Sequence, residues 1–241
     1  MPFPGKASLS QFSFYEPAMD TIEIAQREFL DQLGLKHSIP PRHLQERASG
    51  AYYPEFFLHG SHLAEHIAIL LRRHQVQLEA FERVLDFGCG CGRILIPLSA
   101  RLASRDIYGA DIDPEAIRWC QENLEAFGGF ELNPHRPPSP FPSDFFDFIY
   151  GVSVFTHLPE DLQFHWLEEL QRIVRPGGFL VLTVHGKATH QNLGEAEKVK
   201  LSAEGFLGGM SKRSTFSGLP DFYQTSYHTE SYIQEYWSRY F

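Results

Sequence analysis

Residues 84–93 read VLDFGCGCGR, and this stretch decides the fold class. An apolar, strand-like lead runs into Asp86 and then into three glycines at alternate positions, Gly88, Gly90 and Gly92. Glycine lets the backbone turn sharply and lets a ligand approach without a Cβ in its way. The amides at the start of the following helix then face that ligand. The stretch therefore predicts a small-molecule cradle at the carboxyl end of a strand, where open α/β sheets bind ligands.

The spacing of the glycines narrows the class of ligand. The dinucleotide fingerprint is G-x-G-x-x-G, and here the third glycine comes one residue earlier. No Gly-Lys-Ser/Thr follows the turn, which argues against a nucleoside triphosphate site. A nicotinamide-dependent oxidoreductase stays as a less favoured alternative.

Strand-like and helix-like stretches alternate after residue 82. This alternation predicts an α/β fold with a Rossmann-like, doubly wound, mostly parallel sheet and right-handed crossovers. Asp113 is expected to cap a helix that Pro114 begins, and an Arg-Pro-Gly-Gly turn at residues 175–178 is expected to precede the last strand. The expected strands cover residues 83–87, 107–110, 130–132, 145–152 and 179–184, and the expected helices cover 93–102, 114–126 and 162–174.

The chain divides into three expected parts. Residues 1–82 contain no obvious strand and are expected to form a helical N-terminal cap, with helices over 16–33 and 55–74. Residues 83–184 form the ligand-binding core. Residues 185–241 are expected to form a lid, polar and without a clear period up to residue 219, and a C-terminal helix from Glu230.

Composition limits the partners and the compartment. The 241 residues carry a net charge of -9, which disfavours nucleic acid and anionic membrane surfaces as partners. No stretch reaches the roughly 20 apolar residues of a membrane span. The three cysteines do not form a disulfide framework, and the N-terminus lacks the apolar core of a secretory signal, so we expect a cytoplasmic protein.

A second polar position completes the cradle. Asp111 ends the second expected strand, about twenty residues after the glycine turn, where a carboxylate accepts hydrogen bonds from the hydroxyls of a ribose. The alternative, that an acidic residue here merely starts a helix, is the interpretation we favour for Asp113.

With these positions in place, the sequence resembles a class I S-adenosylmethionine (SAM)-dependent methyltransferase of the small-molecule type. The resemblance runs from about residue 84 to residue 184. Its motifs are LDFGCGCGR (85–93), GADIDPE (109–115), PF (140–141), FFDFIY (145–150), SVFTHL (153–158) and LQRIVRPGG (170–178).

The resemblance implies a role for each motif. Asp86 and the glycine turn hold the methionine part of SAM, Asp111 holds the ribose, and the segment near Asn133 approaches the adenine. The residues after the fourth strand line the methionine side and the mouth of the acceptor site. The implied cofactor-binding residues are Asp86, Gly88, Cys89, Gly90, Gly92, Asp111, Ile112, Asn133, Ser153 and Val154.

The chain departs from the family in two ways. Asn133 stands near the position where many relatives carry an acidic residue for the adenine amino group. We expect the last two strands of the family sheet to be missing, which leaves about five strands. The fifth strand would then have an unpaired edge, through which the chain could form an oligomer.

His157 is the candidate general base, since it follows the fourth strand and an imidazole takes a proton near neutral pH. The alternative is that its ring hydrogen-bonds the backbone and shapes the loop. Aromatic and polar residues are candidates for the acceptor pocket, with the alternative that they are core residues with a polar tip. These candidates are Tyr53, Phe155, Tyr223, Tyr227 and His228.

We expect no metal. Cys89 and Cys91 are two residues apart, which fits neither C-x-x-C chemistry nor a zinc site. His59, His62 and His66 share helical spacing, but a polar helix face near the cofactor explains them better than a metal site.

The sequence therefore favours a SAM-dependent methyltransferase that acts on a small molecule or on a group presented by a carrier. One alternative is a SAM-binding protein without turnover that serves as a regulatory partner. A nucleic-acid methyltransferase is disfavoured because no basic stripe is visible.

Overall fold

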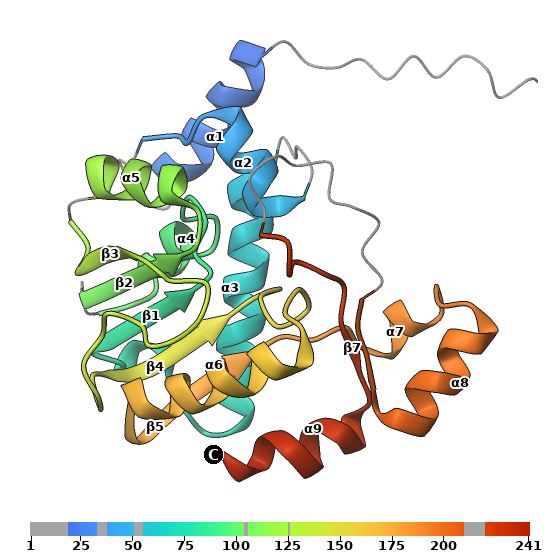
Figure 1. Cartoon of the computed structure of the whole chain (residues 1–241). Coiled ribbons are helices and arrows are strands. Elements are labelled where there is room, and N and C mark those ends of the chain that lie inside the picture. Colours follow the sequence, from blue (N-terminus) through green and yellow to red (C-terminus); the bar gives the residue numbers. More distant parts are fainter. Residues whose placement is uncertain (1–18, 33–37, 51–54, 104–105, 125, 210–219) are drawn as a thin grey trace, which may run out of the picture.

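The computed structural model describes residues 19–32, 38–50, 55–103, 106–124, 126–209 and 220–241. Its centre is a five-stranded sheet with the strand order β3-β2-β1-β4-β5, and all neighbouring strands are parallel (Figure 1). This confirms the predicted α/β, Rossmann-like fold and its five strands. The strands are β1 (Arg83–Phe87), β2 (Asp106–Asp111), β3 (Gly129–Leu132), β4 (Phe146–Gly151) and β5 (Val174–Leu182).

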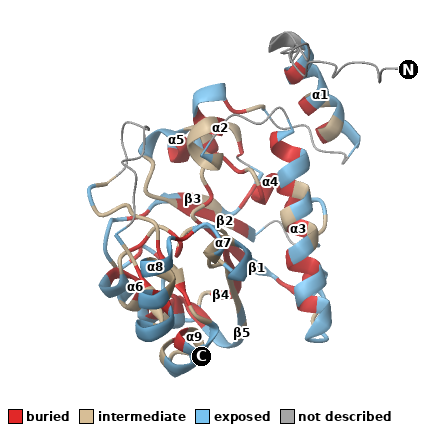
Figure 2. Cartoon of the chain, turned by 90° about the vertical axis from the view of Figure 1, so that its right-hand side faces the viewer, coloured by how far each residue is buried: buried red, intermediate tan, exposed pale blue. Residues whose placement is uncertain are grey.

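Helices cover both faces of the sheet because side chains alternate along each strand. On β1, Val84 packs among α3, α4 and α5, whereas Leu85 packs among α6 and α9. Figure 2 shows the buried strands between helices whose outer faces are exposed. These helices are α3 (Phe56–Arg73), α4 (Leu95–Ser99), α5 (Pro114–Asn123), α6 (Glu160–Ile173) and α9 (Glu230–Tyr236).

The start of α5 follows the predicted capping. The Asp113 side chain accepts hydrogen bonds from the amides of Glu115 (3.0 Å) and Ala116 (3.2 Å), and Pro114 occupies the first turn. These bonds satisfy two of the amides that a helix start leaves unpaired.

The turn before β5 lies inside the strand and not before it. Val174 pairs with Phe146 and Phe179 pairs with Phe148, so residues 175–178 bulge out of the ladder. Gly177, with φ +78°, supplies the left-handed conformation that the bulge needs. The sequence identified the turn correctly but placed the start of the strand five residues too late, because Val174 already pairs with β4 before the bulge.

The flanking segments contain more structure than the sequence predicts. α2 is only eight residues long and mostly polar, with Leu44 as its one buried apolar side chain, and half of α8 is charged, with Leu201 as its one buried residue, so neither shows a long apolar stripe. β6 and β7 pair with each other and do not extend the main sheet. The flanking elements are α1 (Met19–Gln32), α2 (Arg42–Ser49), the 3₁₀ helix η1 (Leu78–Ala80), α7 (Lys187–His190), α8 (Glu195–Glu204), β6 (Phe206–Leu207), β7 (Tyr227–His228) and the 3₁₀ helix η2 (Trp237–Arg239).

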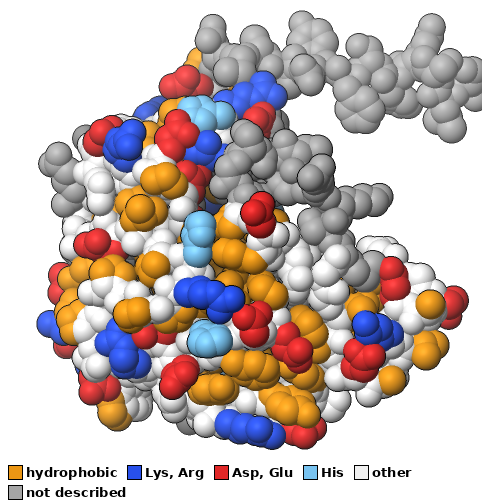
Figure 3. Space-filling model, in the orientation of Figure 1, with side chains coloured by type: hydrophobic (Ala, Val, Ile, Leu, Met, Phe, Trp, Pro, Cys, Tyr) orange, Lys and Arg blue, Asp and Glu red, His pale blue; other side chains and the backbone are white. Residues whose placement is uncertain are grey.

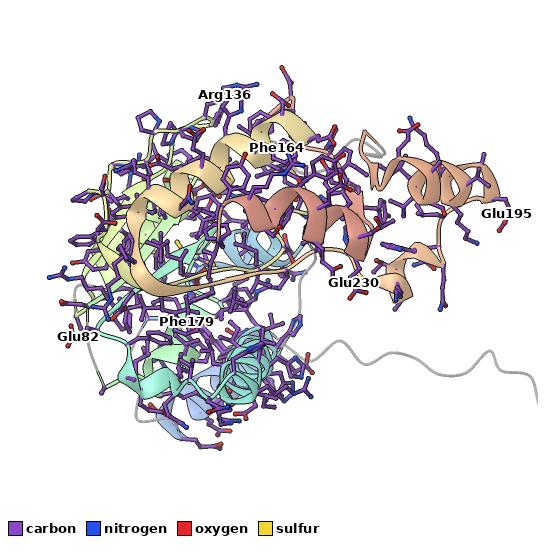
Figure 4. The ribbon with its side chains drawn as sticks, turned by 90° about the horizontal axis from the view of Figure 1, so that it is seen from below. Glu82, Arg136, Phe164, Phe179, Glu195 and Glu230 are labelled. Carbon is purple, nitrogen blue, oxygen red and sulfur yellow. The ribbon has the colours of Figure 1, made fainter. Side chains whose placement is uncertain are left out.

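The C-terminal helix closes one face of the core. Figure 4 shows α9 beside α6 with Phe164 between them, while Glu195 at the start of α8 projects away from the sheet. The Phe164 ring lies 6.5 Å from the rings of Tyr236 and Tyr240. Figure 3 shows hydrophobic side chains gathered over this part of the surface.

Among the described residues, the outer edge of β5 has no strand partner, and the expected oligomer through that edge stays a prediction. No helix in the same ranges has the length and apolar character to cross a membrane.

Candidate functional site

A cavity of about 700 Å³ lies at the carboxyl ends of the parallel strands. The residues that follow β1, β2, β3 and β4 all contribute to its lining, which is the place where ligands bind in open α/β sheets. Most of the implied cofactor residues meet there. Those that line the cavity are Asp86, Gly88, Cys89, Gly90, Asp111, Ile112, Asn133, Ser153 and Val154.

The glycine turn needs its glycines for close packing as well as for conformation. Gly88 (φ +85°) and Gly90 (φ +52°) adopt left-handed backbone angles. A Cβ on Gly88 would lie 2.3 Å from a methyl of Val154, and a Cβ on Gly90 would lie 2.8 Å from the Cβ of Ala48. The turn is therefore held between the loop after β4 and helix α2, with no room for a side chain on either side.

Asp111 joins the glycine turn to the end of β2. Its carboxylate accepts hydrogen bonds from the amides of Gly90 (2.7 Å) and Asp113 (2.9 Å). Burial raises the pKa of Asp111, and these two backbone donors oppose the rise because they favour the charged form.

Asp86 is the most strongly perturbed acid of the site. It is 2% exposed at the end of β1. Burial raises its pKa to about 7, and the neighbouring charge of Asp111 adds to the rise while Arg93 opposes it. A carboxyl with this pKa is ready to become an anion when a cation enters the cavity.

Asn133 offers the cavity an unused acceptor. Its backbone amide donates to the carbonyl of Asp111 (2.8 Å), which fixes the segment after β3 beside the end of β2. The side chain is 5% exposed, and its Oδ1 has no hydrogen-bond partner within the described part of the chain. A buried acceptor without a donor is costly, so the site fits a ligand that brings an N–H group.

His157 also lines the cavity, and its tautomer follows from its contacts. Nδ1 lies 3.1 Å from the carbonyl oxygen of Gln224, which only accepts, so Nδ1 carries the proton and Nε2 carries a lone pair. Burial lowers the pKa of His157, and the nearby His185 lowers it further. The imidazole is therefore neutral at pH 7 with a basic nitrogen, which a general base requires.

Residues 220–226, here called the strap, bring a C-terminal segment to the cavity. The amides of Gln224 and Ser226 donate to the carbonyls of His157 (3.1 Å) and Thr156 (2.8 Å). The Tyr223 ring stacks on His157 with centroids 4.3 Å apart and an interplanar angle of 15°. Phe222 and Tyr223 thereby become part of the cavity wall.

The N-terminal flank supplies another wall. Arg47 on α2 forms ion pairs with Asp113 (2.8 Å) and Glu115 (2.7 Å) at the start of α5. His59 on α3 also lines the cavity, and burial together with Arg93 lowers its pKa. Sequence reasoning missed α2 because its partners lie 66 and 68 residues away along the chain.

Some candidates lie elsewhere. Phe155 is fully buried and packs on Trp237 at 5.1 Å, because the loop after β4 turns its side chain into the core. His228 is 3% exposed and bonds Gln163 (2.8 Å), and Tyr227 packs on His185; neither lines the cavity, contrary to expectation.

The remaining candidates complete the placement. Gly92 lies behind the turn, where a Cβ would meet Ile96 at 3.0 Å. Tyr53 lies outside the described residues. His62 and His66 are exposed, and the described residues contain no group of three or more potential metal ligands. His59, which the sequence predicted on a polar helix face near the cofactor, lines the cavity. Residues that the sequence did not single out complete the lining: Arg47, Ala48, Ser49, Gly50, Leu63, Phe87, Arg93, Ile94, His135, Val152, Leu158, Trp166 and Phe222.

Comparison with known proteins identifies the core. Residues 84–178 match the family described as methyltransferase domain. This segment is a class I SAM-dependent methyltransferase domain. The match confirms the family that the motifs indicated, and with it SAM as the cofactor.

The methyltransferase domain also has curated relatives. Ribosomal protein L11 methyltransferases from Streptococcus thermophilus and Streptococcus pneumoniae are 30% identical over 111 residues, which is 44% of this chain and 32% of theirs. The match thus spans about a third of the length of these relatives.

Solved structures similar to the methyltransferase chain were also found. A SAM-dependent methyltransferase from Methanosarcina mazei is 24% identical and covers 68% of this chain and 79% of its own, with a TM-score of 0.49. Magnesium protoporphyrin IX methyltransferase from Synechocystis PCC 6803, solved with bound SAM, is 19% identical. The match covers 85% of this chain and 94% of that protein, with a TM-score of 0.44.

Proposed function

We propose that this protein transfers the methyl group of SAM to a small-molecule acceptor. The observation that carries the proposal is the convergence of a buried acid, a ribose-type carboxylate and an unpaired amide oxygen on one cavity: Asp86, Asp111 and Asn133. Each lies at or after the carboxyl end of a different parallel strand. The set matches the amino group, the ribose hydroxyls and the adenine amino group of one ligand.

The residues present fit SAM by their donor and acceptor chemistry. Asp86 is an acceptor for the ammonium group of the methionine part, and Asp111 has two oxygens for a vicinal diol. Asn133 Oδ1 lacks a donor within the described residues and would accept from an exocyclic amine. The glycines of the turn let Val154 and Ala48, which also line the cavity, pack directly against its backbone.

When bound, SAM supplies an activated methyl group on a sulfonium. The chain orients the acceptor toward that group, excludes water and, where the acceptor carries a proton, removes it. His157 is the proposed general base, since its Nε2 is unprotonated and free of hydrogen bonds within the described residues. The neutral ring also avoids repelling a sulfonium cation.

A small acceptor suits the size and the walls of the site. The cavity of about 700 Å³ falls in the range of small-molecule pockets. In this proposal, residues 83–184 form the SAM-binding domain. Residues 1–82 and 185–241 supply the cover, the first through α2 and α3 and the second through the strap.

Titration calorimetry with SAM and with S-adenosylhomocysteine tests the proposal. Asp111→Asn should weaken both ligands at least tenfold, or about 1.4 kcal/mol, because one acceptor for the ribose is lost. Asp106→Asn is the matched control: Asp106 is exposed at the opposite end of β2 and should leave both affinities unchanged.

The calorimetric result is read together with turnover. Release of S-adenosylhomocysteine with any small acceptor supports the proposal. Wild-type protein that binds neither ligand, or equal affinities for Asp111→Asn and Asp106→Asn, contradicts it. Binding without turnover on a broad panel of acceptors would favour a regulatory SAM-binding protein.

A further inference from the structure

We propose that the methyl acceptor is a planar compound with a weakly acidic hydroxyl, such as a phenol, and that Tyr223 positions it beside His157. This inference rests on the proposed function and names the acceptor class of the same site. It follows from the charge of the lining, the tautomer of His157 and the flat walls that the strap provides.

The charge of the lining argues against a cationic amine. Among the described residues that line the cavity, the carboxylates are Asp86 and Asp111, at the ends of β1 and β2. Both belong to the proposed SAM site. The other titratable side chains there are five bases, one thiol and one phenol: Arg47, His59, Arg93, His135, His157, Cys89 and Tyr223. An alkyl amine is a cation at pH 7 and would lack a carboxylate of its own.

The tautomer of His157 argues for a hydroxyl. Nδ1 is occupied by the Gln224 carbonyl at 3.1 Å, so the basic nitrogen is Nε2. A carboxylate acceptor has no proton to give and needs no base. A phenol is neutral at pH 7 and has a proton that a neutral imidazole can take as the oxygen reacts.

The flat side chains of the lining favour a planar acceptor. Tyr223 stacks on His157, Phe222 packs edge-on against His135 at 5.5 Å, and Trp166 adds an indole. Aromatic faces bind planar ligands by stacking. Burial raises the pKa of Tyr223 to about 12, with a contribution from Asp111, so its hydroxyl stays protonated.

The strap holds these rings in place before an acceptor arrives. The Ser226 hydroxyl donates to the Leu158 carbonyl (2.7 Å), and the Gln224 amide group donates to the Ser226 hydroxyl (2.9 Å). With the two backbone bonds to Thr156 and His157, this network fixes Tyr223 against the ring of the base. A preformed wall reduces the entropy lost when an acceptor binds.

The proposed step balances. The acceptor oxygen forms a bond to the methyl carbon, and the bond between that carbon and sulfur breaks with its electron pair going to sulfur. The hydroxyl proton passes to Nε2 of His157, which later releases it to water.

The experiment compares matched acceptors. Hydroxyflavones and catechols are tested with labelled SAM beside compounds of the same skeleton that carry an alkyl amine or a carboxylate in place of the hydroxyl. We expect kcat/KM at least about tenfold higher for the phenols. Calorimetry of the same compounds on protein loaded with S-adenosylhomocysteine gives a readout that needs no turnover, and the phenols should bind most tightly.

Two variants separate the roles of the rings. Tyr223→Leu should weaken phenol binding about threefold to tenfold, while Tyr223→Phe keeps it, because only the first loses the aromatic face. His157→Asn keeps a donor for the Gln224 carbonyl but has no base. It should lower kcat by about 10² or more and abolish the loss of rate at acidic pH, an effect larger than any loss of phenol binding that follows from removing the ring on which Tyr223 stacks.

His185→Asn is the matched control for His157→Asn. His185 also bonds a backbone carbonyl through Nδ1 (3.0 Å to Ser226) but does not line the cavity. Preference for amines, or equal kcat in the two histidine variants, overturns the proposed acceptor class. If the protein still binds SAM in that case, the proposed function stands. SAM binding with no binding or turnover of any phenol also overturns it, whereas absence of SAM binding refutes the proposed function itself.

Discussion

Replacing Asp86 with Asn should make the ligand-free protein more stable and the SAM complex weaker. Asp86 is 2% exposed, and burial raises its pKa to about 7. An aspartate in an unfolded chain titrates near 3.9. Between these two values the folded state binds more protons than the unfolded state, so the free energy of unfolding falls as pH rises through this window.

The size of the effect follows from the two pKa values. The loss in the free energy of unfolding that comes from the raised pKa of Asp86 should grow by about 3 kcal/mol between pH 5 and pH 8. Asn is nearly the same size and cannot ionise. The difference in unfolding free energy, Asp86→Asn minus wild type, should therefore increase by about that amount over the same pH range. Urea unfolding of both proteins at pH 5 and pH 8 measures it.

Asp147→Asn provides a control with the opposite sign. Asp147 is equally buried, but its carboxylate accepts from the amides of Glu82 (2.7 Å) and Arg83 (2.9 Å) and lies 3.5 Å from Arg175. Asn keeps one acceptor oxygen and loses the charge and the other acceptor, which removes one bond worth about 1.5–3 kcal/mol, so Asp147→Asn should destabilise the protein at pH 8.

The ionisation of Asp86 also predicts how the affinity for SAM depends on pH. In the proposed function the ammonium group of SAM binds ionised Asp86, so wild-type affinity for SAM should rise from pH 6 to pH 8, whereas Asp86→Asn should bind SAM more weakly with no such rise. An Asp86→Asn protein that is equally destabilised at pH 5 and pH 8 would refute the account of Asp86 as a charge held ready for the ligand.

Three further changes test the packing around the site. Gly60→Ala should lower stability by about 1–3 kcal/mol in thermal unfolding, although Ala normally favours helices, because its Cβ would lie 1.8 Å from a backbone oxygen just after the glycine turn. Gly186→Ala, with open space around it, should not. Arg47→Gln should speed the dissociation of S-adenosylhomocysteine in stopped flow, because α2 loses its ion pairs with the two carboxylates at the start of α5. The dissociation rate should then depend less on salt. Arg42→Gln is the control: Arg42 pairs with Glu46 within α2, and its loss should leave the rate unchanged. Burial lowers the pKa of His228 to about 4, so the folded state binds fewer protons than the unfolded state below pH 6.5, and His228→Gln should reduce acid destabilisation between pH 7 and pH 4.5 by up to about 3 kcal/mol in urea unfolding.

The sequence was sufficient to predict that most of the residues proposed to hold the cofactor meet at one cavity. Asp86, Asp111 and Asn133 each stand at or just after the end of a strand, and the strands are visible as short apolar runs. A parallel sheet brings such ends to one edge, so their meeting follows from the fold class. The alternate spacing of the glycines that follow Asp86 was sufficient to predict the turn.

The other half could not be predicted because it depends on distant contacts. Arg47 meets carboxylates 66 and 68 residues away, and Phe222 meets His135 across 87 positions of sequence. Contacts between residues so far apart leave no periodic pattern in the sequence. Side-chain direction in a loop has no period either, which is why Phe155 was expected at the acceptor mouth and lies in the core.

This division bears on how the site acquires specificity. The cofactor side belongs to the ends of the strands, where a change of side chain disturbs the sheet as well as the ligand. The side proposed for the acceptor is formed by α3 and by the strap, whose bonds to the loop after β4 run through the backbone and through Gln224 and Ser226. None of these hydrogen bonds uses the side chain of Phe222 or Tyr223, whose rings contact His135 and His157. Exchanging those rings should alter which acceptor is methylated while the SAM side of the cavity stays intact.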